Sequence, residues 1–93
     1  MVKVVKRGGA EEEFIPDKIR ESVSKAAKEA GLAVDKIRVL VREIAEPVIQ
    51  LFGKKEVVKT SELRKSLLGR LDRKAKKVSI AWRKHDKTVK KIG

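Results

Sequence analysis

Apolar residues recur along this chain with the period of a helix in two long stretches. From Pro16 to Ala30, and again from Val34 to Phe52, they fall three or four positions apart, which is the spacing of one buried helix face. Gly31 and Gly53 follow these stretches and predict where the two helices end. Pro47 lies inside the second stretch, where it removes a backbone hydrogen bond, so we expect a kink there.

The beginning of the chain predicts a β-hairpin. Two short segments, Val2–Lys6 and Glu11–Ile15, flank the pair Gly8-Gly9. Glycine accepts positive φ at both central positions of a tight turn, so the pair predicts a two-residue turn. That turn would place Lys6 opposite Glu11 as a cross-strand ion pair.

The second half of the chain predicts one more strand and two more helices. Glu56–Lys59 is a short strand that we expect to pair with the hairpin. Thr60 is a suitable N-cap for a helix over Ser61–Leu71. A break at residues 72–73 precedes a last helix over Lys74–Lys87. The elements predict an α+β fold, mostly helical, in which an N-terminal β-hairpin plus a short third strand cap a four-helix cluster.

Size and composition narrow the possible classes of protein. A chain of 93 residues with 41% apolar residues predicts a single domain over residues 1–93. The absence of cysteine and the single histidine argue against a disulfide framework, a zinc ribbon or another bound metal. No apolar run approaches the roughly 20 residues that span a bilayer, and a signal peptide's apolar core is missing. We therefore expect a cytoplasmic protein without a membrane partner. Abundant Lys, Arg and Glu are typical of a thermophile.

Positive charge is concentrated in the C-terminal region, residues 54–93. Residues 1–53 hold 10 basic and 9 acidic side chains, whereas residues 54–93 hold 15 and 4. Such a concentration predicts a surface for a polyanion such as DNA or RNA, bound without sequence preference and more weakly as salt rises. A solvated, lysine-rich helix face is the alternative. The candidate nucleic-acid contacts are Arg73, Lys76, Lys77, Arg83, Lys84, Lys87 and Lys90.

Three cations near the hairpin form a candidate phosphate site. Lys6 and Arg7 end the first predicted strand, and Lys18 lies in the first turn of the helix after the hairpin. Side chains from both elements can therefore converge on one anionic ligand. Charge-assisted hydrogen bonds from such cations are the chemistry of a polyphosphate site. The alternative to a phosphate site is that these three cations are simply solvated, at the end of a strand and on the face of a helix.

The stretch from Val4 to Ile19, which contains these three cations, resembles the start of the ATP-cone. The ATP-cone is a small regulatory nucleotide-binding domain of ribonucleotide reductases and of their repressors. Two later segments, Val58–Leu63 and Val78–Arg83, fit the same pattern, with Trp82 at a position that is usually tyrosine. The resemblance spans about residues 3–88 and implies a free-standing domain in which a helical bundle lies under a short β-sheet. The matching residues in the first segment are Val4, Lys6, Arg7, Gly9, Glu12, Phe14, Lys18 and Ile19.

The resemblance implies a regulatory module that binds ATP or dATP, with or without Mg²⁺, and controls a protein partner or its own homo-oligomer. It implies no enzymatic activity, and the sequence contains neither a Gly-x-x-x-x-Gly-Lys loop nor a nucleophile with its base. Phosphates would be held by cations and by a helix N-terminus, and Val4 and Glu12 would line the nucleoside. The implied nucleotide-binding residues are Val4, Lys6, Arg7, Glu12, Lys18, Thr60 and Arg64.

Two positions depart from the family pattern. Gly8 replaces an Asp or Asn of the turn, which a hairpin tolerates. Ile15 replaces the Asp or Asn that caps the first helix and helps to hold adenosine in nucleotide-bound members. Isoleucine can do neither, so the phosphate side is intact while the nucleoside side is altered. Two alternatives to nucleotide binding stay open: a nucleic-acid-binding protein, and a protein-interaction module whose nucleotide site has decayed.

Overall fold

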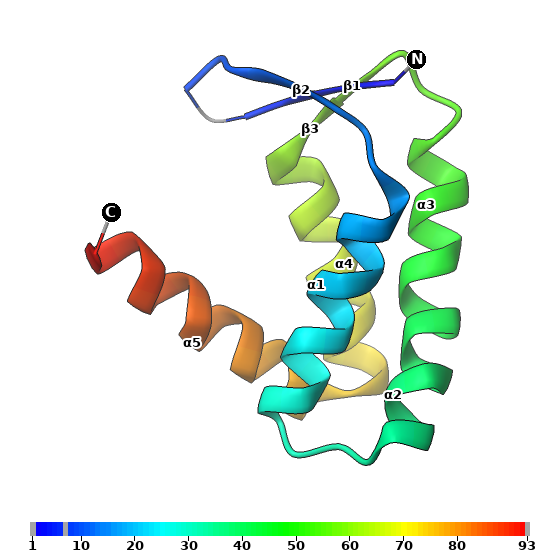
Figure 1. Cartoon of the computed structure of the whole chain (residues 1–93), viewed down its shortest axis with the longest axis vertical. Helices are drawn as coiled ribbons and strands as arrows, with labels where there is room; N and C mark the ends of the chain where they lie inside the picture. The colour runs from blue at the N-terminus through cyan, green and yellow to red at the C-terminus, as the bar shows by residue number, and fades with distance from the viewer. Residues whose placement is uncertain (1, 7, 93) are drawn as a thin grey trace.

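The computed structural model covers the whole chain and describes residues 2–6 and 8–92, with side chains described for residues 2–6 and 8–85. Two short strands come first, and helices make up most of the remaining chain (Figure 1). The elements in chain order are β1 (Lys3–Val5), β2 (Glu11–Glu13), α1 (Pro16–Glu29), α2 (Val34–Leu40), the π-helical turn η1 (Val41–Ala45), α3 (Glu46–Phe52), β3 (Val57–Lys59), α4 (Thr60–Lys74) and α5 (Lys76–Ile92).

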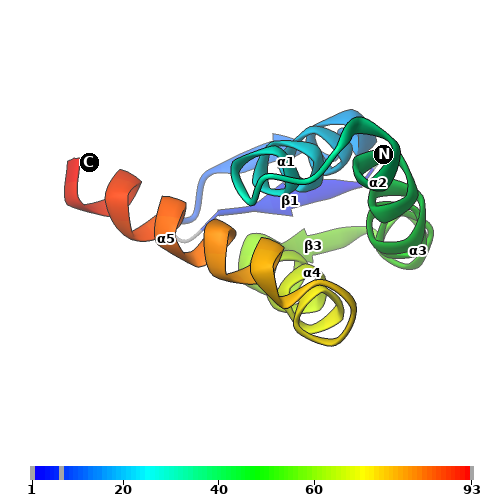
Figure 2. The same cartoon turned by 90° about the horizontal axis from the view of Figure 1, so that it is seen from below.

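The three strands form one small sheet that caps the helices, as the sequence predicted. The strand order is β2-β1-β3, with β1 antiparallel to β2 and parallel to β3. Below the sheet stand α1, the rod made by α2, η1 and α3, and α4, while α5 crosses beside α1 and α4 and then projects from the body (Figures 1 and 2). The predicted α+β architecture is confirmed. Among the described residues, no helix is long and apolar enough to cross a membrane.

The core lies between the inner face of the sheet and the helices. Val4 of β1 and Val58 of β3 occupy paired positions in the sheet, and both are buried. Val23, Ile44 and Leu71 are fully buried and bring α1, η1 and α4 into the same cluster. The helical periodicity therefore identified the faces that pack together, because these apolar side chains leave water only when the sheet and the helices meet.

The hairpin turn differs from the predicted one by a single residue. Lys6 N donates to Ala10 O at 2.8 Å, and Gly9 N donates to Lys6 O at 2.9 Å. Of the two glycines only Gly9 has a positive φ, at 88°. The prediction that Lys6 faces Glu11 was therefore wrong. Because neighbouring strand residues point to opposite faces, the shift places Lys6 on the face of Glu12.

Pro47 is accommodated by a change of helix type. In η1 the Glu46 N–H donates to Val41 O, five residues back, instead of the usual four. Proline has no N–H to donate, so the wider turn directly before it absorbs the interruption of the hydrogen-bond ladder. The helix predicted over residues 34–52 is present as the continuous rod of Figure 1, with a π-helical turn where we expected a kink.

The boundaries of α4 and α5 also differ from the prediction. Thr60 is the first residue of α4, and the preceding Lys59 holds the N-cap position without a side-chain cap. The Thr60 hydroxyl instead donates to Val5 O at 3.2 Å, which ties α4 to β1. The prediction that Thr60 caps the helix was thus wrong. The break before α5 falls at Ala75, whose φ of −153° and ψ of 72° are not helical, instead of at residues 72–73.

We predict that Gly53→Ala destabilises the fold by about 1–3 kcal/mol, because an added methyl group has no room. A Cβ at Gly53 would lie 2.7 Å from the carbonyl oxygen of Ile49 and 3.7 Å from the Phe14 ring. Chemical denaturation measures the change in the free energy of unfolding. The matched control is Gly69→Ala within α4, where a Cβ meets nothing within 4 Å. Alanine favours the helix there, so this variant should gain up to about 1 kcal/mol; equal losses in both variants would contradict the steric argument.

Candidate functional site

Parallel pairing of β1 and β3 brings two polar segments to the same edge of the sheet. Val5 pairs with Lys59, so the next residues, Lys6 and Thr60, leave the sheet beside each other. The hydrogen bond from Thr60 Oγ1 to Val5 O fixes this arrangement. Since α4 begins at once, its first backbone N–H groups, which have no partner within the helix, also lie at this edge. The edge therefore combines a lysine with the positive end of a helix.

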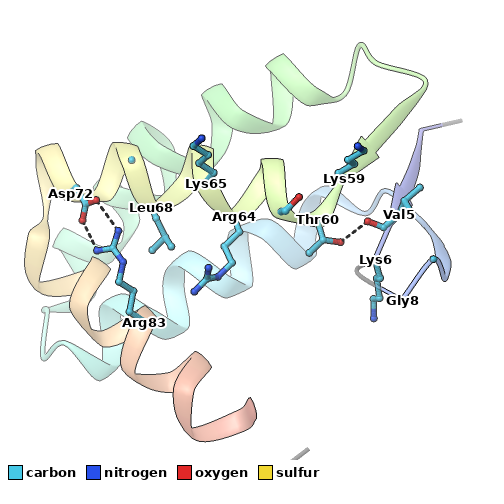
Figure 3. Close-up of a pocket in the computed structure, with 13 residues that line it drawn as sticks. Val5, Lys6, Gly8, Lys59, Thr60, Arg64, Lys65, Leu68, Asp72 and Arg83 are labelled. Atoms are coloured by element: carbon cyan, nitrogen blue, oxygen red, sulfur yellow. Dashed lines mark hydrogen bonds and ion pairs between the residues drawn. The ribbon is translucent and has the colours of Figure 1, made fainter. Parts of the chain in front are cut away.

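A groove with a volume of about 1070 Å³ starts at this edge and runs along α4 to α5 (Figure 3). Thr60, Arg64, Leu68 and Asp72 line it from successive turns of α4, because residues four apart share one helix face. Asp72 is the one carboxylate among the described lining residues. The basic residues of the lining are Lys6, Lys59, Arg64, Lys65 and Arg83.

Three of these cations share one side of α4. In Figure 3, Lys6, Arg64 and Arg83 lie on the side of the helix that the hairpin and α5 also border, whereas Lys59 and Lys65 point to the other side. The three belong to the hairpin, α4 and α5. A groove bordered by cations from three elements can bind an extended anion along its length, which a single basic helix face cannot surround.

Glu12 pairs with Lys6 at the hairpin end of this groove. The Lys6 ammonium donates to Glu12 Oε1 at 2.7 Å. This hydrogen bond from Lys6, together with the positive charges of Lys6 and Lys18, lowers the pKa of the Glu12 carboxyl. Both lysines that the sequence singled out thus act on the same carboxylate, Lys6 through a hydrogen bond and Lys18 through its charge.

Asp72 is held at the other end of the groove by hydrogen bonds from α5. Arg83 donates from Nη1 to Oδ1 and from Nη2 to Oδ2, both at 2.9 Å. The fully buried Ser79 donates from Oγ to Oδ1 at 2.5 Å. The Arg83 and Ser79 hydrogen bonds hold the pKa of Asp72 well below its usual range. We call this arrangement of Asp72, Ser79 and Arg83 the clasp, because it joins α5 to the end of α4.

The remaining predicted site residues lie in different surroundings. Val4 is only 9% exposed and its side chain belongs to the core. Arg7 lies outside the described residues, as do the side chains of Lys87 and Lys90. The other residues predicted for nucleic acid, apart from the clasped Arg83, are exposed on the last turn of α4 and on α5: Arg73, Lys76, Lys77 and Lys84.

Sequence reasoning did not place Lys59, Lys65 and Asp72 in this groove, and it assigned Arg83 to another surface. The row of residues four apart from Thr60 to Asp72 was visible in the sequence and indicated one helix face. The sequence held no such signal for Arg83. Its side chain reaches Asp72 only because the backbone break at Ala75 folds α5 back toward the end of α4. In the described part of the chain, no group of three or more His, Cys, Asp or Glu residues gathers as a metal site would need.

Asp72 contributes to stability only while it is ionised, which predicts a pH dependence. Its pKa is lower in the folded than in the unfolded protein. The contribution is therefore present above about pH 4 and disappears as the pH falls further. We expect the melting temperature of Asp72→Asn to lie below that of the wild type near pH 7, with the difference shrinking between about pH 5 and pH 3.

Thermal unfolding followed by circular dichroism across this pH range measures the effect. Glu21→Gln makes the same charge change at an exposed position of α1 and serves as the control. A difference for Asp72→Asn that stays constant with pH would contradict the assignment of the effect to its ionised carboxylate.

Comparison with known proteins agrees with the fold. No curated protein matches this chain in sequence. The family model of the ATP cone domain matches residues 2–88, which include the sheet, the groove and all but the end of α5. The resemblance carried by the first hairpin and by two later segments is thereby confirmed over nearly the whole sequence, and this chain belongs to the ATP-cone family.

Proposed function

We propose that this ATP-cone domain binds ATP or dATP in the groove and thereby controls a protein partner or its own assembly. One observation carries the proposal: Lys6, Arg64 and the positive end of α4 border the same open groove. Membership of a family of nucleotide-binding regulatory domains supports it. The ATP-cone is regulatory instead of catalytic, so we assign no reaction to the groove.

The phosphates would lie at the start of α4. The first N–H groups of α4 can donate to one phosphate, and the Thr60 hydroxyl can do so when it exchanges Val5 O for the ligand, while Lys6 and Arg64 approach from either side. Lys6 is paired with Glu12 in the free protein, so a phosphate must attract it more strongly than one carboxylate does. Arg7 and Lys18 complete the proposed set of cations, and Mg²⁺ would arrive with the nucleotide.

The nucleoside would lie toward α1, beside the residues that flank the Lys6–Glu12 pair. Val4 can offer only an apolar edge, because its backbone belongs to the middle strand of the sheet and its side chain belongs to the core. Glu12, once released by Lys6, can accept hydrogen bonds from a ribose hydroxyl or from the base. Ile15 is 39% exposed directly before α1 and offers no hydrogen bond, so this side relies on fewer polar contacts.

Binding would change the protein's surface through the elements that border the groove. A ligand that contacts Lys6, Lys18 and Thr60 links the hairpin, α1 and α4, which the free protein joins mainly through the core. It would therefore favour one arrangement of these elements over others. We infer that residues 1–93 respond as one unit and present the altered surface to a protein partner or to a second copy. A cytoplasmic location and a thermophilic source remain predictions from composition.

Calorimetry with ATP and dATP tests this proposal. We expect Lys6→Gln to weaken binding by a factor of about 10 to 100, because it removes a charge-assisted hydrogen bond to phosphate. Lys3→Gln is the matched control, since Lys3 lies on the same strand but on the opposite face and pairs with Glu11 at 3.8 Å. The proposal would be wrong if millimolar ATP or dATP gave neither heat nor protection from thermal unfolding.

A second function, nucleic-acid binding, is supported by the exposed cations of α5. Lys76, Lys77 and Lys84 are exposed on this helix, which projects from the body (Figure 1), and Arg73 precedes it on α4. Such a helix can contact a phosphate backbone without reading bases. The proposed contacts include Lys87 and Lys90 further along α5, and the same domain could respond to a nucleotide at its other end.

Gel-shift experiments over a range of salt concentrations test the second function. We expect binding to DNA or RNA of any sequence, with an affinity that falls steeply as salt rises. The double variant Lys76→Gln, Lys77→Gln should bind more weakly and with a shallower salt dependence, because two phosphate contacts are lost. Lys25→Gln with Lys28→Gln removes the same charge from α1 and should change little. No shift even at low salt would exclude this function.

A further inference from the structure

Arg83 lies on the wall of the groove, yet its guanidinium is engaged by Asp72. The bidentate pair is partly open to solvent, with side-chain exposures of 45% for Arg83 and 35% for Asp72. It is therefore accessible to a ligand in the groove. Among the side chains that the structure describes, Arg83 is also the one groove residue that belongs to α5, so anything that binds it acts directly on the position of that helix.

We propose that Arg83 is a further anion-binding contact of this groove, released from Asp72 only by a ligand whose chain of phosphates is long enough to reach it. The inference rests on the proposed function and adds to it a requirement on the ligand. A nucleoside triphosphate would extend from the end at Lys6 and Thr60 toward Arg83, which would swing to meet it, whereas a monophosphate would engage only the end at Lys6 and Thr60.

The length of the groove supports this requirement. The segment of α4 from Thr60 to Asp72 rises about 18 Å, at about 1.5 Å per residue. Arg64 lies between the two ends, on the same side of α4 as Lys6 and Arg83 (Figure 3). A single phosphate at the start of α4 therefore lies far from Arg83. A chain of phosphates that continues past Arg64 shortens the gap, and the long arginine side chain can close it.

On release, Asp72 loses the two Arg83 hydrogen bonds, which are the largest cause of its lowered pKa, and Arg83 Nη1 also gives up its bond to Ser79 Oγ at 2.6 Å, but Asp72 keeps one hydrogen bond. Ser79 is fully buried and its hydroxyl still donates to the carboxylate after Arg83 leaves. The positive charge of Lys76 also acts on Asp72, since it contributes to the lowered pKa of this carboxyl. Arg83 in turn exchanges a carboxylate for a phosphate, which its planar fork binds with two parallel hydrogen bonds. Neither charge is left without a partner.

Movement of Arg83 would change the position of α5 and the surroundings of the neighbouring Trp82. Trp82 is half-buried, packs against the core and lies beside Ala26 and Glu29 of α1. His85 Nδ1 lies 3.5 Å from Glu29 Oε1, one turn further along α5. The helix is thus held by the clasp on one side and by these contacts on the other. Trp82 is the only tryptophan of the chain, so its fluorescence reports the fit of α5 against α1.

The experiment titrates AMP, ADP and ATP into the full chain, with binding measured by calorimetry and Trp82 emission recorded in parallel. For the wild type we expect AMP to bind without an emission change and ATP to bind with one. Arg83→Gln should weaken ATP binding about tenfold, remove the emission change and leave AMP binding unaffected. Lys28→Gln, which removes the same charge from an exposed position of α1 outside the groove, should behave like the wild type.

Asp72→Asn provides a second variant with the opposite effect. Asparagine can still accept from Ser79 but holds Arg83 less strongly, so ATP binding should become roughly two- to fivefold tighter. The inference fails if Arg83→Gln, with its circular dichroism spectrum unchanged, binds ATP as tightly as the wild type, or loses AMP and ATP binding equally. ATP binding that leaves Trp82 emission unchanged overturns the inference and leaves the proposed function standing. Absence of ATP binding by the wild type overturns both.

Discussion

The parallel contact between β1 and β3 is the constraint on which the rest of this structure depends. It joins segments more than fifty residues apart, and the loss of chain entropy on closing that loop is offset by burial of Val4 and Val58 at the centre of the sheet. The same register brings Lys6 and Thr60 together at one edge and starts α4 there. Core packing and groove geometry therefore have a common origin, and a register shift would separate the two halves of the site.

Carboxylates hold the cations of the groove in place before any ligand arrives. Glu12 pairs with Lys6 at the hairpin end and Asp72 pairs with Arg83 at the α5 end. Without these partners the like charges along α4 would repel one another and their long side chains would lose defined positions. An anion that binds Lys6 or Arg83 must therefore compete with the carboxylate that already holds that cation. Such a groove favours ligands with several negative charges over ligands with one.

The sequence predicted the helices and the hairpin well, because both leave local signals. The apolar stripe of α1 and the residues around Gly8-Gly9 needed no distant information. The features that could not be predicted depended either on a choice between two similar neighbouring residues or on how two helices are oriented relative to each other. Two adjacent glycines do not reveal which one takes the positive φ, so the register was wrong by one residue. The return of Arg83 to Asp72 depends on the angle between α4 and α5, which no local pattern encodes.

Arg83 also links the two functions that the chain can support. It was assigned from the sequence to the basic surface of α5. In the structure its side chain instead lines the groove, where it pairs with Asp72. The exposed Lys76 and Lys77 precede Arg83 on α5, where they can contact a polyanion, while Arg83 borders the groove. If both ligands bind, each acts on the position of the same helix, and the effect of one on the affinity of the other must be reciprocal. The sign of that coupling depends on whether release of the clasp moves α5 toward the nucleic acid or away from it.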